Sequence, residues 1–410
     1  MNPNTIRIED PFATPPAPAT GFALFHYGFR PFFFLAGLFA AVSVPLWVAL
    51  YAGGVDLNLT ASPLAWHGHE MLFGYTGAAI AGFFLTVVPN WTEEKARRGG
   101  VLIALSLAWL IGRIAFWAQG VLPYGMVMAA DMAFLLGLFW LIYRPLVDPK
   151  YRRQFVFVPI LGVLIAANAM VHMGIWGVDW GGRDWTARGL SLAVDGVIVL
   201  IAVMGGRVTP SFTSSYVGHT DPNFKVKQSL SLDRNVMFAT WAMLVVDQIS
   251  PLGPVAGAIS LFAAVLHAVR LSGWKTGRTL QNPILWVLHL AYGWMVLGLA
   301  LKALGDWGVV APGDVLHALT IGAVGNYTLG IMTRASLGHT GRKIHAARPI
   351  VWAYVLVSAA AVLRLAVAVL PELSTELVMA SGAAWTVAFA IFFAVYAPIL
   401  MRPRVDGRPG

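Results

Sequence analysis

The residues of this chain that are best suited to bind a metal are its histidines. Ten histidines and no cysteine occur among 410 residues, of which 58% are hydrophobic. We expect four of the histidines to lie at one depth near the same face of a membrane: His67, His69, His172 and His317. Imidazole is costly to bury in lipid and is the commonest metal ligand, so such a layer indicates a buried metal or haem centre.

Because the chain has no cysteine, it lacks the thiolate ligand that several kinds of metal centre require. Covalent c-type haem, iron–sulfur clusters, thiolate-bound copper and disulfides are all excluded. Histidine, methionine and carboxylate remain as ligands.

The spacing of His67 and His69 separates their roles. In a regular α-helix two residues are about 200° apart, so the two imidazoles cannot hold the same metal ion. One face of such a helix would present His67 with Glu70, Met71 and Gly74, and His69 would point the other way. The two histidines therefore serve two sites, or one of them serves none.

Two further histidines reach the same depth from distant parts of the chain. His172 follows Asn168 by about one turn near the end of one apolar segment, and His317 lies about one turn inside the start of another. For any single histidine, a hydrogen-bonded contact between helices is an alternative. Agreement in depth among three segments favours metal or haem for the set.

A second group of histidines is expected nearer the opposite face. His289 lies about two turns inside its apolar segment and His267 lies in the preceding one. Because His289 needs a polar partner at that depth, two interpretations of this pair remain: a second metal centre and a proton relay. The intramembrane Asp131, Asp195 and Asp247 fit either as relay members or as partners of arginine.

Two arginines are expected to require a buried anion. Arg113 and Arg364 each lie roughly a turn or more inside an apolar segment, where an unpaired guanidinium would cost about 2 kcal/mol or more. A haem propionate or an aspartate would satisfy each of them. Other basic residues at segment ends are explained by snorkelling.

Membrane-spanning helices must position these residues. Only 11% of the chain is charged, and its apolar runs repeatedly reach the length of about 20 residues that crosses a bilayer. We predict an all-α polytopic membrane protein with twelve transmembrane helices, at 31–52, 63–89, 100–118, 123–143, 154–177, 186–206, 233–250, 252–271, 282–303, 312–333, 348–370 and 376–400.

Charge placement predicts the orientation of these helices. Most of the 28 Lys and Arg residues fall in alternate connecting segments, which should face the cytoplasm. Both termini are then cytoplasmic, with a tail at 1–29, a transmembrane domain at 30–401 and a second tail at 402–410. The net charge of +9 is spread over these segments rather than gathered on one face, so it does not indicate nucleic-acid binding.

Several stretches resemble the NnrS family. They are Gly28–Phe33, His67–Met71, Gly205–Pro210, His289–Tyr292, and above all His317–Gly325 continuing to Ser336–Arg342. The resemblance implies a bacterial inner-membrane protein that contains haem b and copper and belongs to denitrification and the nitric oxide response, protecting against nitrosative stress. Its matched positions are His26, His67, His69, Glu70, Arg207, His289, His317, His339 and Arg342, with His172 a weaker match.

One position departs from the family pattern, because Thr209 stands where Ile or Val is expected. This change affects packing and not the proposed ligands.

From their depth and from the resemblance, we interpret six residues as cofactor-binding: His67, His69, His172, His317, Arg113 and Arg364. We interpret five as metal ligands: His67, His69, His172, His289 and His317. Second-tier candidates are His26, Glu70, Met71, Asp195, Arg207, His267, His339 and Arg342.

The leading hypothesis is a haem and copper protein that binds or reduces nitric oxide at a histidine-ligated metal. Nitric oxide or a similar diatomic would arrive through the lipid, and a quinol or a protein would donate electrons; if the protein is an enzyme, it is an oxidoreductase. By analogy with haem-copper oxidases, haem would lie between the second and tenth helices, ligated by His317 and by His67 or His69. The alternatives are a proton-coupled secondary transporter that uses intramembrane His and Asp, and a haem-based sensor or assembly protein without turnover.

Overall fold

The protein is a bundle of long helices. The computed structural model describes residues 21–178 and 181–408, and within them the chain is helical without a β-strand. Helices longer than about 18 residues form where apolar side chains can face lipid on one side and the bundle on the other. The predicted all-α fold is confirmed.

Twelve long helical segments occur in the described part of the chain, and each matches one predicted segment. They are α1 (Phe29–Tyr51), the continuous α2 (Pro63–His69), η1 (Glu70–Thr76) and α3 (Gly77–Thr92), then α4 (Gly100–Trp117), α5 (Tyr124–Leu146), α6 (Phe157–Ile175), α7 (Trp185–Gly218), α8 (Leu230–Ile249), α9 (Pro254–Ser272), α10 (Pro283–Asp306), the continuous α11 (Pro312–Val315), η4 (Ala318–Gly325) and α12 (Asn326–His339), then α13 (Arg348–Ala366) and α14 (Ser374–Met401). Short 3-10 turns η2 (Pro149–Tyr151), η3 (Thr276–Thr279) and η5 (Pro371–Leu373) lie in the connections.

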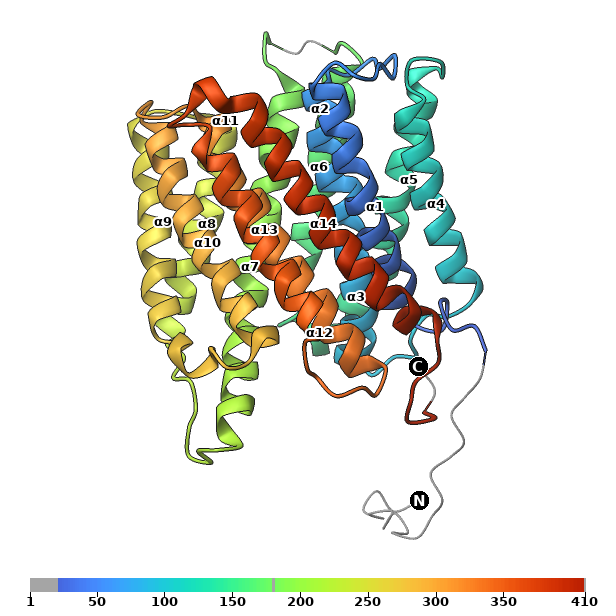
Figure 1. The fold of residues 1–410 in the computed structure, drawn as a ribbon, viewed down its shortest axis with the longest axis vertical. Coiled ribbons are helices and arrows are strands. Elements are labelled where there is room, and N and C mark those ends of the chain that lie inside the picture. Colours follow the sequence, from blue (N-terminus) through green and yellow to red (C-terminus); the bar gives the residue numbers. More distant parts are fainter. Residues whose placement is uncertain (1–20, 179–180, 409–410) are drawn as a thin grey trace.

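Eleven of these segments in the described residues are long and apolar enough to cross a membrane. The other is α8, which carries Asp233, Arg234 and Asp247 and packs against α7 and α9. The predicted end of the sixth helix at residue 206 is wrong, because α7 continues to Gly218 and extends below the other helices (Figure 1). The polar residues after 206 are compatible with a helix that leaves the apolar layer.

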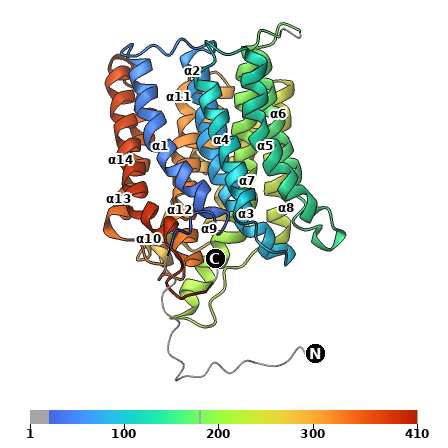
Figure 2. The ribbon, with the colours of Figure 1, turned by 90° about the vertical axis from the view of Figure 1, so that its right-hand side faces the viewer.

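The bundle has two ends, which we name the upper and lower ends after Figure 1. The spans that contain α2 and α11 begin at the upper end, and the described termini lie at the lower end (Figures 1 and 2). There the Ala23 amide donates a hydrogen bond to the Met401 carbonyl at 2.8 Å. The α2–η1–α3 and α7 spans are the most buried, and α7 contacts α6, α8, α10 and η4.

Two spans contain π-helical turns, which the sequence patterns did not predict. Both η1 and η4 directly follow a histidine, His69 and His317, in spans that begin at Pro63 and Pro312. A π-turn widens the helix by about one residue and changes which side chains share a face, and such turns are frequent at functional sites. They occur where the candidate ligands lie.

Candidate metal centre and neighbouring cavity

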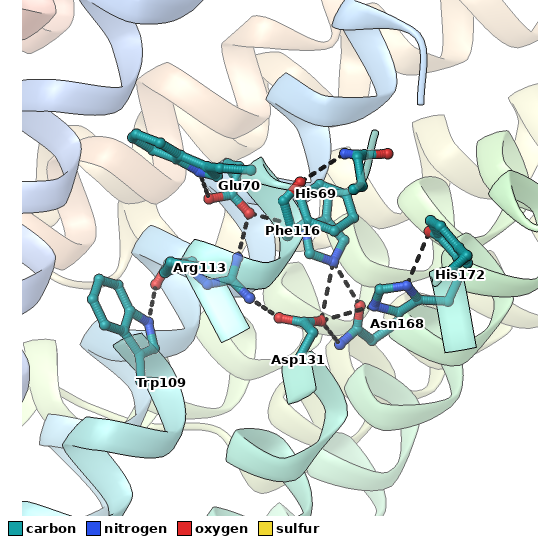
Figure 3. Close-up of polar contacts among 12 residues, drawn as sticks. His69, Glu70, Trp109, Arg113, Phe116, Asp131, Asn168 and His172 are labelled. Atoms are coloured by element: carbon teal, nitrogen blue, oxygen red, sulfur yellow. Dashed lines mark hydrogen bonds and ion pairs between the residues drawn. The ribbon is translucent and has the colours of Figure 1, made fainter. Parts of the chain in front are cut away.

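Three buried side chains from three helices converge near the upper end. His69 ends α2, Asp131 lies on α5 and His172 lies on α6. Asp131 Oδ2 is 3.2 Å from His69 Nε2 and 2.9 Å from His172 Nε2 (Figure 3). One ligand atom from each residue lies within 4.8 Å of the others. Two imidazoles and a carboxylate are a donor set that suits a transition metal.

Hydrogen bonds hold these ligands in place. Asn168, one turn before His172 on α6, contacts His69 Nε2 through Oδ1 at 3.0 Å and donates from Nδ2 to Asp131 Oδ2 at 2.7 Å. The Tyr124 hydroxyl hydrogen-bonds with His172 Nδ1 at 3.1 Å. Partners of this kind orient metal-binding imidazoles and set their tautomers. We name His69, Asp131 and His172 the metal-ligand cluster.

Arg113 balances the acidic groups beside this cluster. Its guanidinium forms ion pairs with both Glu70 and Asp131, and Trp117 Nε1 donates to Glu70 Oε2 at 2.7 Å. Two carboxylates and one guanidinium leave a formal charge of about −1, which favours a cation between the imidazoles. The buried anion predicted for Arg113 is therefore Asp131 together with Glu70, and Arg113 is not available to a haem propionate.

Aromatic rings pack against His69 of the metal-ligand cluster. Phe116 stacks on His69 with ring centroids 3.7 Å apart, and Phe73 lies 5.0 Å from the same ring. All three side chains of the cluster are buried, and a low local dielectric strengthens the electrostatic interactions among them.

A cavity of about 930 Å³ lies on the other side of α2. His67 and His317 both line it, and the buried Nδ1 of each lacks a hydrogen-bond partner within the described chain. The His317 ring also lies near the backbone of Gly313. His67 stacks on Trp47 with centroids 4.5 Å apart. Two imidazoles thus face one space without fixed polar partners.

The same cavity contains a cation and an aromatic wall. Arg364 of α13 lines it, and Nη1 of that guanidinium has no hydrogen-bond partner among residues 21–178 and 181–408. Met71, Tyr75 and Trp385 contribute to the walls. The Tyr75 hydroxyl also contacts Thr328 Oγ1 at 2.5 Å, which joins η1 to α12.

The predicted layer of four histidines is therefore divided between two sites. His69 and His172 belong to the metal-ligand cluster, whereas His67 and His317 face the cavity. The condition of a regular helix, on which the face shared by His67 and Glu70 depended, is not met, because the chain is π-helical from Glu70. As a result Glu70 lies with His69, Nδ1 to Oε1 3.1 Å, rather than with His67.

The predicted grouping of Gly74 with His67 is wrong for the same reason. Trp109 Nε1 donates to the Gly74 carbonyl at 3.0 Å, and a Cβ at Gly74 would lie 3.2 Å from Arg113 Nη1. Met71, by contrast, lines the cavity with His67 as predicted.

The two deeper histidines are engaged elsewhere. His289 hydrogen-bonds with the hydroxyls of Thr213 and Thr276, each at 2.9 Å. His267 hydrogen-bonds with the hydroxyls of Thr240 at 3.0 Å and Tyr292 at 2.6 Å. Neither belongs to a cluster of three metal-ligand residues in the described part of the chain. The geometry gives no support to His289 as a metal ligand.

The remaining second-tier residues lie apart from both sites, except that Asp195 lines the cavity. His26 is exposed, and His339 packs against Tyr27 and Phe29 near the lower end. Arg207 donates to the Arg153 carbonyl at 3.1 Å and Arg342 is half-buried. These residues connect the chain ends and loops rather than line either site.

Sequence reasoning missed several contributors to the two sites, among them Asp131 as a metal ligand, since it was assigned only as a relay member or a partner of arginine. Trp47 and Phe116 stack on the histidines, and Lys302 lies in the cavity wall. An aromatic residue among many others carries no sequence signal for stacking. For Lys302 the sequence does contain a signal. It lies four positions before Asp306 at the end of an apolar segment, a spacing that places an ion pair on one helix face.

Comparison with protein families adds an independent observation. The family model described as NnrS protein matches residues 23–404. The match spans α1 to α14 and so includes both candidate sites. No curated protein matches the chain.

Proposed function

Because the chain belongs to the NnrS family, a family of membrane proteins of the nitric oxide response, we propose that it binds or reduces nitric oxide with the help of haem and copper. Haem is assigned to the cavity between His67 and His317, and copper to the metal-ligand cluster. We place the protein in the bacterial inner membrane, with both termini in the cytoplasm.

The observation that carries the haem assignment is the pair of unbonded imidazoles in one large cavity. His67 and His317 come from separate spans, face the same space of about 930 Å³ and have no partner for Nδ1 in the described residues. Imidazole is a common ligand of haem iron, so these two residues would hold the group. When bound, it would supply an iron that coordinates nitric oxide and exchanges electrons.

The cavity also fits the periphery of a haem. Arg364 has an unpartnered guanidinium nitrogen at the wall, which suits a propionate. Trp47 and Trp385 offer apolar faces to the ring. These residues would bind and orient the group, and they would limit the access of water.

The metal-ligand cluster fits copper by the chemistry of its donors. Imidazole is a good ligand for copper, and the Asp131 carboxylate adds negative charge. Glu70 and Tyr124 hold the rings of His69 and His172, respectively, each through Nδ1, so that little order has to be gained on binding.

Nitric oxide requires no polar binding pocket, because it is small and dissolves in lipid. Because two imidazoles would occupy the iron, nitric oxide would bind it in place of one of them, and the cavity needs only to leave room for that exchange. Electrons would come from a quinol or a protein donor.

The test combines absorption spectra with metal analysis of the purified full chain. We expect wild-type protein to show a Soret band that shifts on reduction and on addition of nitric oxide. His317→Ala and His67→Ala should lose haem and keep copper. His69→Ala should lose copper and keep haem, and His219→Ala, at an exposed position near the lower end, should keep both.

Three outcomes decide between the hypotheses. A folded, colourless and metal-free wild type would overturn the proposal and favour a proton-coupled transporter. Haem that persists in both His67→Ala and His317→Ala would overturn the cavity assignment. A normal spectrum without consumption of nitric oxide in the presence of an electron donor would indicate a sensor or assembly role.

A further inference from the structure

The cavity has a second, acidic wall that the proposed cofactors do not use. It is formed by Asp195 of α7, Asp247 of α8, and Lys302 and Asp306 of α10. Lys302 Nζ lies 2.9 Å from both carboxylate oxygens of Asp247. It lies 3.0 and 2.9 Å from the two oxygens of Asp306. The ammonium group is thus shared between two carboxylates.

Asp195 lacks such a partner. It is 2% exposed, lines the cavity, and its Oδ2 has no hydrogen-bond partner within the described residues. Asp247, on the neighbouring helix α8, lines the same wall, and the two carboxyl groups interact. Two buried carboxyl groups attract each other only when one of them carries a proton.

The charges around this wall do not provide a second cation. Ser260 of α9 is neutral and donates to Asp306 Oδ2 at 2.8 Å. Arg188 of α7 donates to the Gln248 carbonyl at 2.6 Å. The other charged or titratable groups that line the cavity are on α1, α2–η1, α11–η4 and α13: Tyr51, His67, Tyr75, Asp314, His317 and Arg364.

The balance of charge therefore requires a proton. Three buried carboxylates against one ammonium would leave a formal charge of about −2 inside the bundle. A buried carboxylate beside a like charge is strongly unfavourable, and neighbouring carboxyl groups respond by sharing a proton. A neutral Asp195 removes one of these charges and makes its contact with Asp247 attractive.

We propose that Asp195 and Asp247 share a proton at neutral pH and that this pair donates protons to a ligand bound in the cavity. On donation the O–H bond of the carboxylic acid breaks, the proton moves to the ligand, and the electron pair stays on the carboxylate oxygen. Lys302 stabilises the carboxylate that remains. The pair is reprotonated from water at the upper opening of the cavity, where Ser62 and Leu252 are exposed. The shared proton is inferred from the acidic wall alone, whereas proton donation to a bound ligand rests on the proposed function.

Infrared spectroscopy of the purified full chain tests the first part. We expect wild-type protein at pH 7 to show the C=O stretching band of a buried, protonated carboxylic acid, shifted in deuterated water. Asp195→Asn, which is nearly isosteric and neutral, should abolish the band. Asp221→Asn, in the loop after α7, should leave it unchanged. Absence of the band from wild type, or its persistence in Asp195→Asn, would overturn the proposal.

A second variant keeps the test decisive if Asp195→Asn misfolds. Lys302→Met removes the only ammonium that contacts these carboxylates in the described structure. A further carboxyl group must then take up a proton, so the band should grow about twofold. An unchanged band in folded Lys302→Met protein would contradict the charge balance proposed here.

Haem spectra separate this proposal from the proposed function. Asp195→Asn should retain its Soret band, because Asp195 is not an assigned ligand, while nitric oxide consumption with an electron donor should fall at least tenfold. Unaltered consumption in Asp195→Asn would refute proton donation by the pair. The carboxylic acid band without haem would refute the proposed function alone, and haem without the band would refute the proton site alone.

Discussion

Arg113 is the residue on which the local charge balance at the metal-ligand cluster depends. It is 4% exposed and pairs with two buried carboxylates, Glu70 and Asp131. Removing one partner of a buried ion pair leaves an uncompensated charge, which is far more costly than the loss of an exposed pair. The arginine therefore holds α4 against α2–η1 and α5.

We expect Arg113→Met to lower the free energy of unfolding by about 3–5 kcal/mol. Thermal unfolding in detergent measures the effect. The control is Arg97→Met, which breaks a pair with Glu94 that is 40% and 44% exposed, and should change stability by about 0–1 kcal/mol. Equal effects of the two variants would contradict the role of burial.

At the lower end, Asp406 provides a titration outside the membrane-spanning segments. The hydrogen bonds from Arg404, Nε to Oδ1 2.9 Å and Nη2 to Oδ2 2.5 Å, lower the pKa of Asp406 from 3.8 to about 2. Because the folded pKa is depressed, this pair stabilises the fold fully above the ordinary pKa. The contribution is lost as the pH falls through about 2.

Carboxyl NMR of the labelled side chain measures this titration directly. We expect a midpoint near 2 in wild-type protein, and a midpoint close to the ordinary value of 3.8 in Arg404→Gln. Identical midpoints in the two proteins would show that Arg404 does not bind Asp406 in solution.

Among the elements, η4 depends on close packing against α10. A Cβ at Gly322 would lie 2.6 Å from the Trp294 ring, whereas a Cβ at Gly338 in α12 would meet only Ile344 Cδ1, at an ordinary contact distance of 3.8 Å. Trp294 is held by a hydrogen bond from Nε1 to Ser358 Oγ at 3.2 Å. The glycine therefore lets the π-turn approach a ring that has little freedom to move.

We expect Gly322→Ala to destabilise the protein by about 1–3 kcal/mol, as overpacking commonly does. It should also lower the haem content, because η4 carries His317 at its start. Gly338→Ala, a change of the same size in the same span, should affect neither. Thermal unfolding and haem content per chain measure both variants, and a harmless Gly322→Ala would contradict the packing argument.

The existence of the spans was predictable, but their internal geometry was not. An apolar run of about 20 residues must cross the bilayer whatever its neighbours are. A π-turn is a small local change whose cost is offset by contacts with other helices, such as Trp109 with the Gly74 carbonyl. The face that Glu70 presents could therefore not be read from helical periodicity.

At the scale of the molecule, the described ends of the chain lie at the lower end with the basic loops (Figure 1). Lys and Arg in short loops are retained in the cytoplasm during insertion. The chain has no cysteine, so single cysteines can report the side of each loop.

We expect Val121→Cys, in the upper loop after α4, to react with a membrane-impermeant maleimide on spheroplasts. Lys227→Cys, in the lower loop before α8, should react only after the membrane is permeabilised. The opposite pattern would invert the proposed topology, and with it the side from which water reaches the cavity.

Depth along a helix and rotation about its axis differ in how far they can be predicted. Depth follows from counting residues, so the chain order alone brought His67, His69, His172 and His317 to one level and located the buried Arg113. Rotation follows from which side chains pack against which neighbours. It separated His67 from His69, paired Arg113 with Glu70, and placed Asp195 and Asp247 in one wall, because each of these arrangements depends on how separate helices pack against one another.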